Sequence, residues 1–433
     1  MSAPLKIAVA GLGTVGVGTI ELLNAQAALL EQRCGRPIEV TAVSSRDRSR
    51  DRGVDLSPYL WFDDAVEMAA IADAEVIVEL IGGSDGPAKA LTEAAIRAGR
   101  HVVTANKAMI ALHGPELGTA ADEAGVALCY EAAVAGAVPV VRAIREGLAA
   151  NRIGRLHGIL NGTCNYILTT MRETGRDFDD VLEEAQRLGY AEADPSFDVD
   201  GIDTAHKLAI LASLAFGTRI DFDDTYVEGI RRISADDIAF ATELGYRIKL
   251  LGTAQLSDGG IQLRVHPAMV PMDAPIASVE GVLNAVECDS DFAGTTMLEG
   301  RGAGAGPTAS AVVGDLVDIA LGRTTPVYGV PVAALASLPV LPMDDHVGPY
   351  YVILMVYDKP GVFADVAAIL RDHEISMEAV LQRSRSTTEP VPVVLKTHEA
   401  RESGVSSALA AIGKLAAVSE PPHMIRIEPF EAD

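Results

Sequence analysis

The feature that most constrains the fold is a short apolar run followed at once by closely spaced glycines. Leu5–Ala10 (LKIAVA) is continuously apolar, as a strand buried inside a parallel sheet is. GLGTVG follows and leads into a helical pattern that extends through Leu30. In this strand–turn–helix context, Gly11 permits the tight turn, Gly13 lets the backbone approach a pyrophosphate, and Gly16 lets helix and strand pack closely. The pattern predicts a Rossmann dinucleotide-binding domain, with cofactor contacts from Gly11, Gly13, Thr14, Val15 and Gly16.

The end of the second predicted strand bears on which dinucleotide binds. This strand is Ile38–Val43, and a site specific for NAD usually ends it with an acidic residue that bonds the ribose 2′-hydroxyl. Here Ser44, Ser45 and Arg46 follow, which offer hydroxyls and a guanidinium to a 2′-phosphate. We therefore expect NADP(H) to be preferred over NAD(H), with Ser44 and Arg46 among its contacts. Arg46 as an ordinary surface residue is the alternative.

Further strand and helix patterns place one lysine at the functional edge of this sheet. Glu75–Ile81 and His101–Thr104 are predicted strands, with a helix over Pro87–Gly99 between them. Ligands of such sheets bind at the carboxyl ends of the strands. Lys107 comes just after the second of these strands and is therefore placed to meet a cofactor or a substrate.

A loop of small residues follows the next predicted strand, Val126–Tyr130. Glu131 begins the loop, which extends to Pro139. Several backbone carbonyls and one carboxylate could surround a hard monovalent cation here, because such ions take oxygen ligands. A plain connection into the next helix is the alternative, and the residues alone favour it.

A second candidate region is the acidic stretch Gly189–Lys207, which leads into an apolar helix. Asp203 and Lys207 are four residues apart and share one helix face. Taken alone, an acid ahead of a helix is ordinary capping, and this pair would be a solvated surface pair. The residues around Asp198 partly fit a calcium loop, but Lys207 would occupy the most demanding ligand position, which excludes calcium.

The middle of the chain changes from alternating strands and helices to consecutive strands. This change indicates a separate α+β layer. Open sheets of this kind commonly pair across a two-fold axis, so we expect a homo-oligomer, either a dimer or a tetramer. The predicted strands are Tyr246–Ala254, Ile261–Val270, Gly281–Cys288 and Thr295–Leu298.

A second glycine-rich segment, residues 300–306, precedes a helix that extends through Leu321. Such a helix start could return to the dinucleotide domain and add N–H groups near the cofactor. Gly304 is the predicted contact there. Gly189, expected as the C′ residue of the helix Phe178–Leu188, is predicted as a further cofactor contact.

The overall composition excludes several classes of partner. The formal net charge of the 433 residues is −25, which argues against nucleic acid or an anionic membrane, since both require a basic face. The four cysteines are scattered without metal-binding spacing, which is typical of reduced thiols in a cytoplasmic protein. No apolar run approaches the roughly 18 residues that span a bilayer, and no signal peptide precedes the first strand.

The C-terminal part predicts a small separate module. Ser337–Pro349 has the prolines and acidic residues of a linker. Beyond it the order of elements is βαββαβ, and the segments DKPGVFADVAAIL and EISMEAVLQ resemble an ACT domain. ACT domains bind amino acids for feedback control, so the resemblance implies an amino-acid effector. A module that only dimerises is the alternative, because a fold does not by itself define a function.

Five segments, in this order along the chain, together resemble the homoserine dehydrogenase family. The first is generic, whereas the third and fourth are highly specific. The segments are GLGTVG (11–16), ANKA (105–108), GILNGTCNYIL (158–168), GYAEADPSFDVDGIDTAHKLAILA (189–212) and GRGAGAGPTASAVVGD (300–315). The family interconverts aspartate 4-semialdehyde and homoserine with NAD(P)H, in threonine and methionine biosynthesis.

The resemblance implies a role for each candidate residue. Lys207 would be the proton donor, and Lys107 would contact both cofactor and substrate. The substrate would be held by Glu192, Asp198 and Asp203. These roles suit the chemistry, because hydride addition to an aldehyde builds an alkoxide that needs a nearby proton donor or cation. The carboxylates suit the ammonium group at the amino-acid end of the substrate.

The same resemblance implies a metal site, an effector and a division into domains. Threonine would be the effector of the ACT domain. The sodium site of the family would be matched by Glu131 with the carbonyls of Val134, Gly136 and Val138. In this α/β chain we expect a Rossmann domain over 1–137 with a returning helix at about 305–330, a substrate-binding, catalytic and dimerisation α+β domain over 138–304, a linker over 331–349, and a ferredoxin-like ACT domain over 350–433.

Two other functions remain open from the residues. Another NAD(P)-dependent dehydrogenase of an amino-acid semialdehyde would be favoured by an active-site cysteine, but neither Cys129 nor Cys164 has a partnering histidine at a recognisable spacing. A non-enzymatic, effector-sensing protein could keep the Rossmann domain. The presence of Lys107, Asp203 and Lys207 argues against that class.

Overall fold

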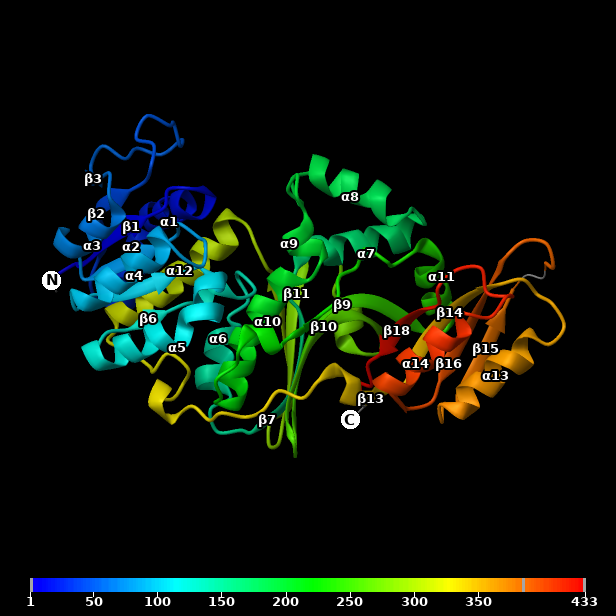
Figure 1. The fold of residues 1–433 in the computed structure, drawn as a ribbon. Coiled ribbons are helices and arrows are strands. Elements are labelled where there is room, and N and C mark those ends of the chain that lie inside the picture. The colour runs from blue at the N-terminus through cyan, green and yellow to red at the C-terminus, as the bar shows by residue number, and fades with distance from the viewer. Residues whose placement is uncertain (1–2, 384–385, 431–433) are drawn as a thin grey trace.

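The computed structural model of the chain describes residues 3–383 and 386–430. Two sheets organise the molecule, and Figure 1 shows the N-terminal sheet at one side, the C-terminal module at the other and a middle layer between them. Within the described ranges, no helix is long and apolar enough to cross a membrane.

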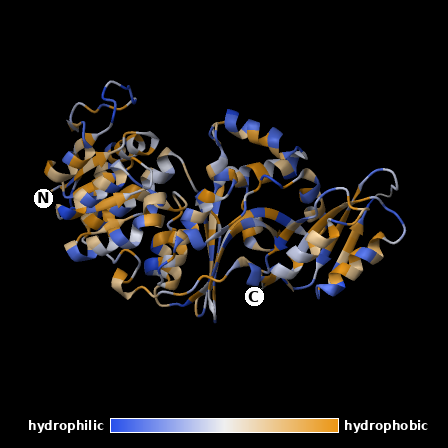
Figure 2. Ribbon diagram, in the orientation of Figure 1, coloured by the Kyte–Doolittle hydropathy of each residue, from blue (hydrophilic) through white to orange (hydrophobic). Residues whose placement is uncertain are grey.

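The N-terminal sheet is parallel and has the strand order β3-β2-β1-β4-β5-β6. The chain moves outward from β1 in one direction and then from β4 in the other, so the switch point lies between these two strands. Ligands of such sheets bind beyond the carboxyl ends at that point. Figure 2 shows hydrophobic residues concentrated in these strands. Their bounds are β1 (Leu5–Ala10), β2 (Ile38–Ser44), β3 (Leu60–Phe62), β4 (Val76–Glu79), β5 (His101–Thr104) and β6 (Leu128–Cys129).

The helices of this layer confirm the predicted Rossmann arrangement with one difference. The helix expected through Leu30 breaks at Gln26, which adopts a non-helical φ of −109° and divides it into α1 and α2. The glycine-rich segment near residue 304 leads into α12, which packs against α1 so closely that a Cβ at Gly18 would lie 3.1 Å from the carbonyl oxygen of Ala305. The helices are α1 (Thr14–Ala25), α2 (Ala27–Cys34), α3 (Ala65–Ile71), α4 (Pro87–Arg97), α5 (Lys107–Ala124) and α12 (Ala305–Ala320).

The second sheet joins the middle of the chain to the C-terminal module. Its order is β12-β11-β7-β9-β10-β18-β14-β16-β15, with β8 pairing alongside β10. The junction is a parallel pairing of β10 with β18, the last strand, through Ala268 with Arg426 and Met269 with Ile427. The strands of the middle layer are β7 (Ile153–Ile159), β8 (Tyr226–Val227), β9 (Tyr246–Ser257), β10 (Gly260–Pro271), β11 (Leu283–Ser290) and β12 (Gly294–Arg301).

The C-terminal module has the predicted βαββαβ order and the ferredoxin-like strand arrangement β18-β14-β16-β15. The segment before it is held in place, because Ile261 donates its N–H to the carbonyl of Pro339 at 2.9 Å and Leu341 donates to the carbonyl of Ile261 at 2.8 Å. A short pair, β13 (Val347–Gly348) with β17 (Ala400–Arg401), continues this attachment. The module consists of β14 (Tyr350–Val356), α13 (Val362–Asp372), β15 (Met377–Gln382), β16 (Val391–Thr397), α14 (Glu402–Ile412) and β18 (His423–Ile427).

The helix that positions the site is α10 (Ile202–Phe216), which lies between the N-terminal layer and the second sheet (Figure 1). Its residues from Asp203 through Leu214 are buried, since apolar side chains cover nearly every face of the run Leu208–Leu214. The helix begins after Gly201, which adopts a left-handed φ of 87°. The other helices of the middle layer are α6 (Val140–Arg142), α7 (Gly162–Thr174), α8 (Phe178–Arg187), α9 (Ser196–Val199) and α11 (Ala235–Glu243).

Candidate active site

Two lysines from different layers meet one aspartate at the start of α10. Lys207 Nζ lies 2.8 Å from Asp203 Oδ2, and Lys107 Nζ, from the first turn of α5, lies 3.0 Å from Asp203 Oδ1. The Asp203 and Lys207 side chains are only 5% and 10% exposed, whereas Lys107 is 35% exposed. The alternative of a solvated surface pair is therefore wrong. Lys107 also lies over the ring of Phe197, 5.4 Å from its centroid.

Asn161 connects this cluster to a second carboxylate. Its side-chain Nδ2 donates to Asp198 Oδ1 and to Asp203 Oδ2, both at 2.8 Å. Its Oδ1 accepts the N–H of Cys164 at 2.8 Å and so caps the N-terminus of α7. The sequence predicted only a turn at Asn161. The signal that pointed to it was its place in the specific segment NGTCNYIL.

The backbone also holds Lys207. Its Nζ donates to the carbonyl of Leu160 at 2.6 Å, and that carbonyl accepts a second bond from Asn284 Nδ2 at 2.9 Å. The lysine is thus fixed by one carboxylate and one carbonyl, both buried. Sequence reasoning missed Asn284, because it lies on a strand far along the chain.

Burial and charge shift the proton affinities in this cluster in different directions. Burial lowers the pKa of Lys207, and the neighbouring Lys107 lowers it further, while Asp203 opposes both effects. Burial alone would raise the pKa of Asp203, but the two lysines hold it well below its usual range. Burial raises the pKa of Asp198. The site therefore combines a stable carboxylate with an ammonium group that gives up its proton more readily than a surface lysine.

Glu192 is the predicted substrate contact that the structure does not bring into this cluster. The residue is exposed on the loop after α8, where Gln186 Nε2 donates to its backbone carbonyl at 3.0 Å. Across the described residues, no hydrogen bond or ion pair joins its carboxylate to the lysines. Its role in holding a substrate stays a prediction.

The glycine loop fits a pyrophosphate. A Cβ at Gly11 would lie 2.3 Å from the carbonyl oxygen of Leu80, and one at Gly16 would lie 1.9 Å from that of Gly11, so both close approaches need glycine. At Gly13 a Cβ would meet no described atom within 4 Å, which leaves open space before α1. Thr14 and Val15 form the first turn of this helix, and no described side chain caps its N–H groups.

A second helix start faces the same region. Gly304 precedes α12 with a φ of 118°, and among the described residues no side chain caps this helix either. Because α12 packs on α1, two sets of backbone N–H groups lie close together. Gly189 has a φ of 78° and follows the C-cap of α8, as predicted for a C′ residue. Its contact with a cofactor stays a prediction.

Several arginines lie beyond β2, where an adenosine 2′-phosphate would be held. Ser44 itself is buried, and its carbonyl accepts the N–H of Gly11 at 2.9 Å, whereas Arg46 is exposed. Arg52 was missed from the sequence. It donates to the carbonyl of Leu12 at 3.1 Å and lies 5.7 Å from the ring centroid of Trp61. Its other nitrogens donate to the carbonyls of Arg50 and Asp47 and to the hydroxyl of Ser45, so Arg52 holds the loop after β2 in place.

The loop after β6 brings oxygen atoms into a buried turn. Ala135 and Gly136 both have a left-handed φ of 54°, and the Glu131 carboxylate accepts the N–H groups of Val141 and Arg142 at 2.9 and 2.8 Å. Burial raises the pKa of Glu131, so a nearby cation would stabilise its charge. Within the described chain, no group of three or more His, Cys, Asp or Glu residues could hold a metal. A sodium site would therefore depend mainly on the backbone carbonyls.

Uncapped helix N-termini and a buried lysine–carboxylate cluster fit an NAD(P)-dependent oxidoreductase that acts on a CH–OH group. Family models agree: that for homoserine dehydrogenase matches residues 139–317, that for its NAD-binding domain 11–131, and that for the ACT domain 350–417. The homoserine dehydrogenase of Pseudomonas aeruginosa is 47% identical over 98% of this chain and 99% of its own. The chain therefore belongs to the homoserine dehydrogenase family.

Solved structures support the same family. A homoserine dehydrogenase from Thiobacillus denitrificans, 44% identical, superposes with a TM-score of 0.93 over 98% of both chains. A hyperthermophilic archaeal homoserine dehydrogenase, solved in complex with NADPH, is 27% identical and has a TM-score of 0.62 over 74% of this chain and 98% of its own. The cofactor of this chain is thus a nicotinamide dinucleotide.

Proposed function

We propose that the chain reversibly reduces L-aspartate 4-semialdehyde to L-homoserine, with NADP(H) preferred and NAD(H) as the weaker cofactor. The observation that carries this proposal is the pair of lysines on Asp203, which lies at the boundary between the dinucleotide layer and the middle layer. The bound cofactor supplies the hydride that reduces the aldehyde carbon. The residues of the chain must then bind the substrate, orient it and deliver one proton.

Lys207 is the proton donor in this mechanism. Its lowered pKa favours transfer of a proton to the alkoxide oxygen that forms as the carbonyl is reduced. Asp203 holds Lys207 in place and keeps it charged between turnovers. Lys107, which is partly exposed, stabilises the developing negative charge and contacts the cofactor.

Asp198 and Glu192 bind the amino-acid end of the substrate. Asp198 is held by Asn161 and is partly buried, so its carboxylate is oriented before the ammonium group arrives. Glu192 is exposed and lies on a loop, so it would approach when substrate binds. The cofactor would be held by the glycine loop, by Gly304 and Gly189, and at its 2′-phosphate by Ser44 and Arg46.

The assay that tests the activity is NADPH oxidation in the presence of aspartate 4-semialdehyde, followed by identification of homoserine as the product. The same assay with NADH tests the cofactor preference, and Arg46→Ala should lower the NADPH/NADH ratio of kcat/KM. Absence of homoserine with either cofactor would contradict the proposed reaction. An unchanged ratio in Arg46→Ala would contradict the proposed 2′-phosphate contact.

We further propose a sodium ion held by Glu131 and the carbonyls of Val134, Gly136 and Val138. The left-handed turn at Ala135 and Gly136 supports this proposal, because it bends the buried loop that contains these carbonyls and Glu131. The ion would stabilise the connection between the dinucleotide layer and the middle layer. A thermal midpoint that rises with sodium chloride but not with choline chloride would support it, and equal midpoints would contradict it.

We also propose that the C-terminal module binds an amino-acid effector, with threonine as the candidate. A cavity of about 780 Å³ at the first turn of α13 supports this, and it is lined by residues that include Lys359, Gly361, Phe363 and Ser386. Ser386→Ala and Phe363→Ala should weaken inhibition by threonine without changing uninhibited turnover. Unchanged inhibition in both variants would contradict the assignment.

The assembly and compartment of the chain are proposals as well. No residue of the edge strand β12 is buried, and Phe292 in the adjoining turn is 89% exposed, which supports pairing with a second copy as a dimer or tetramer. All four cysteines are unpaired and buried, which suits a reducing cytoplasm. Light scattering of the purified chain would test the first proposal, since a monomeric mass would contradict it.

A further inference from the structure

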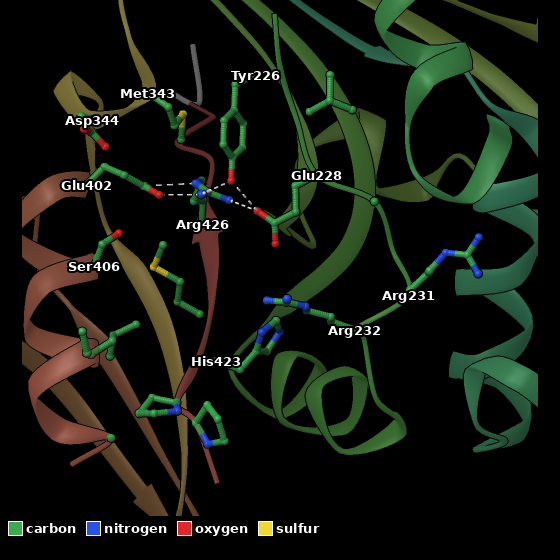
Figure 3. A pocket seen from close by; sticks show the side chains of 18 of the residues that line it. Tyr226, Glu228, Arg231, Arg232, Met343, Asp344, Glu402, Ser406, His423 and Arg426 are labelled. Carbon is green, nitrogen blue, oxygen red and sulfur yellow. Dashed lines mark hydrogen bonds and ion pairs between the residues drawn. The ribbon is translucent and has the colours of Figure 1, made fainter. Parts of the chain in front are cut away.

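A cavity of about 870 Å³ lies in the seam between the C-terminal module and the middle layer (Figure 3). One wall is formed by α14 and β18. The opposite wall is the segment from Tyr226 to Arg232. The cavity also reaches Asp200, which directly follows α9; residues 192–200, which include Asp198 on α9, are called the substrate loop here. This cavity is separate from the one at the first turn of α13.

One end of the cavity is closed by an arginine whose bonds are satisfied. The Arg426 side chain is 2% exposed. Its Nε donates to Glu402 Oε2 at 3.1 Å, its Nη1 to Glu228 Oε2 at 2.7 Å, and its Nη2 to the hydroxyl of Tyr226 at 3.0 Å. Glu402 belongs to the C-terminal module and Glu228 to the middle layer, so this network joins the two walls. It needs no ligand.

The other end presents cations that lack such partners. Arg232 extends into the cavity toward His423 (Figure 3). Lys414, just after α14, also lines the cavity, and both cations are exposed. In the part of the chain that the structure describes, neither Arg232 nor Lys414 has an ion pair with an acidic residue. His423 is not part of this unpaired group, because its buried Nε2 faces the buried carboxylate of Asp237 at 4.0 Å.

The acidic residues of the cavity do not neutralise this end. Asp200 is paired with Arg231, and Glu228 and Glu402 are paired with Arg426. Asp344 remains, and it lies at the far end of the view, beyond Glu402 (Figure 3). In a chain with a net charge of −25, two cations, Arg232 and Lys414, that line a cavity without paired acids point to an anionic ligand.

We propose that this cavity binds a small organic anion, with its carboxylate or phosphate group on Arg232 and Lys414, and that binding changes the position of the substrate loop. The walls between the two ends contain Leu409, Pro422 and Met424, which suit the carbon skeleton of such a ligand. The class is therefore an organic carboxylate or phosphate with a short apolar part, rather than a bare inorganic ion.

The connection to the substrate loop is direct. Ile230 donates its N–H to the carbonyl of Val199 at 2.9 Å, and a Cβ at Gly229 would lie only 2.2 Å from the same carbonyl oxygen. Val199 follows Asp198, the carboxylate that Asn161 orients. A ligand that moves Arg232 would therefore move the backbone that contacts the substrate loop, and the expected kinetic effect is on KM.

The test is calorimetric titration of the full chain, saturated with NADP+ so that the dinucleotide phosphate sites are filled. The probes are glycerol 3-phosphate, succinate and inorganic phosphate. We expect saturable binding of at least one organic probe, and weaker binding of inorganic phosphate. In Arg232→Gln the affinity for the organic probe should fall about tenfold, as expected for the loss of one charged hydrogen bond. Arg371→Gln is the matched control, because it removes the same charge from an exposed position on α13.

Absence of saturable binding of both organic probes would overturn the site. Equal weakening in Arg232→Gln and Arg371→Gln would overturn it too, since the effect would then be one of net charge. For the connection to the substrate loop, the probe that binds should change the KM for the semialdehyde at least about twofold in the wild type and not in Arg232→Gln. An unchanged KM would refute the connection. The titration does not depend on turnover, so it stands apart from the proposed reaction.

Discussion

Replacing Lys207 with methionine tests the central step of the proposed mechanism. The variant keeps the apolar stem and removes the ammonium group that donates to Asp203 and to the carbonyl of Leu160. A positioned general acid contributes about 10²- to 10⁴-fold to a rate, or about 3–5 kcal/mol at 1.36 kcal/mol for each factor of ten. We expect kcat to fall by that factor and the KM for the semialdehyde to change far less.

The structure predicts that this variant still folds. Asp203 keeps its bond from Asn161 and its ion pair with Lys107, and the Leu160 carbonyl keeps its bond from Asn284. The loss of one hydrogen bond to a charged group costs about 1.5–3 kcal/mol, and removal of a buried charge offsets part of it. Circular dichroism and NADPH fluorescence would verify the fold and the cofactor site.

The pH dependence of the reaction rate gives a second, independent test of Lys207 as the proton donor. Reduction needs Lys207 protonated, so its rate should be highest below the lysine pKa and fall as pH rises through it. Because burial lowers this pKa from 10.5, the fall should begin at a lower pH than for a surface lysine. Homoserine oxidation needs the neutral amine, so its rate should rise over the same range. Stopped-flow absorbance of NADPH across a pH series would measure both.

Lys249 provides the matched control. It is also a buried lysine, its Nζ donates to Asn165 Oδ1 at 3.2 Å, and burial lowers its pKa to about 8, but it lies outside the candidate site. Lys249→Met should lower stability and leave kcat within about threefold. The reasoning would be refuted if Lys207→Met kept more than a tenth of the wild-type kcat, or if it kept the alkaline fall in rate.

Four further substitutions test the cofactor loop, the substrate cluster and the seam. Gly16→Ala should lower the thermal midpoint, because its Cβ would lie 1.9 Å from the carbonyl oxygen of Gly11, whereas Gly13→Ala should keep the midpoint and weaken NADPH binding in a fluorescence titration. Asn161→Ala should raise the KM about tenfold in steady-state assays, since two carboxylates lose their shared donor, and an unchanged KM would contradict its positioning role. Glu228→Gln should cost about 1–3 kcal/mol of unfolding free energy in urea titrations, because it weakens the pairing of a buried arginine.

The dinucleotide half of the fold could be predicted because its signals are local. The pattern consists of a continuous apolar strand, three glycines and a helix, all within a short stretch of sequence. The structure shows the close approaches that require Gly11 and Gly16. The prediction of individual strands and helices failed where the sequence pattern was too short or where the break depended on packing. The strand β3 has three residues, and the break at Gln26 separates two stretches that share a helical pattern.

The chemical cluster was predicted only in part, because its geometry depends on contacts between distant segments. Asp203 and Lys207 share one helix turn, and their spacing was visible in the sequence. Whether the pair was buried was not, since burial comes from packing of α10 between two layers. Asn161 donates hydrogen bonds to two carboxylates about 40 positions further along the chain, and no local sequence pattern indicates such a contact.

The shared strand β18 determines how the proposed regulation of this chain can be tested. Glu428, just after β18, forms an ion pair with Arg264 of β10 at 3.0 Å, and both side chains are at most 3% exposed. A chain ended near Pro339 would remove this carboxylate and expose Arg264, which the C-terminal module now covers. It would also remove the strand that pairs with β10. Loss of threonine inhibition after such a truncation could then result from damage to the middle layer or from loss of an effector site. Only point variants that leave β18 intact can distinguish these two causes.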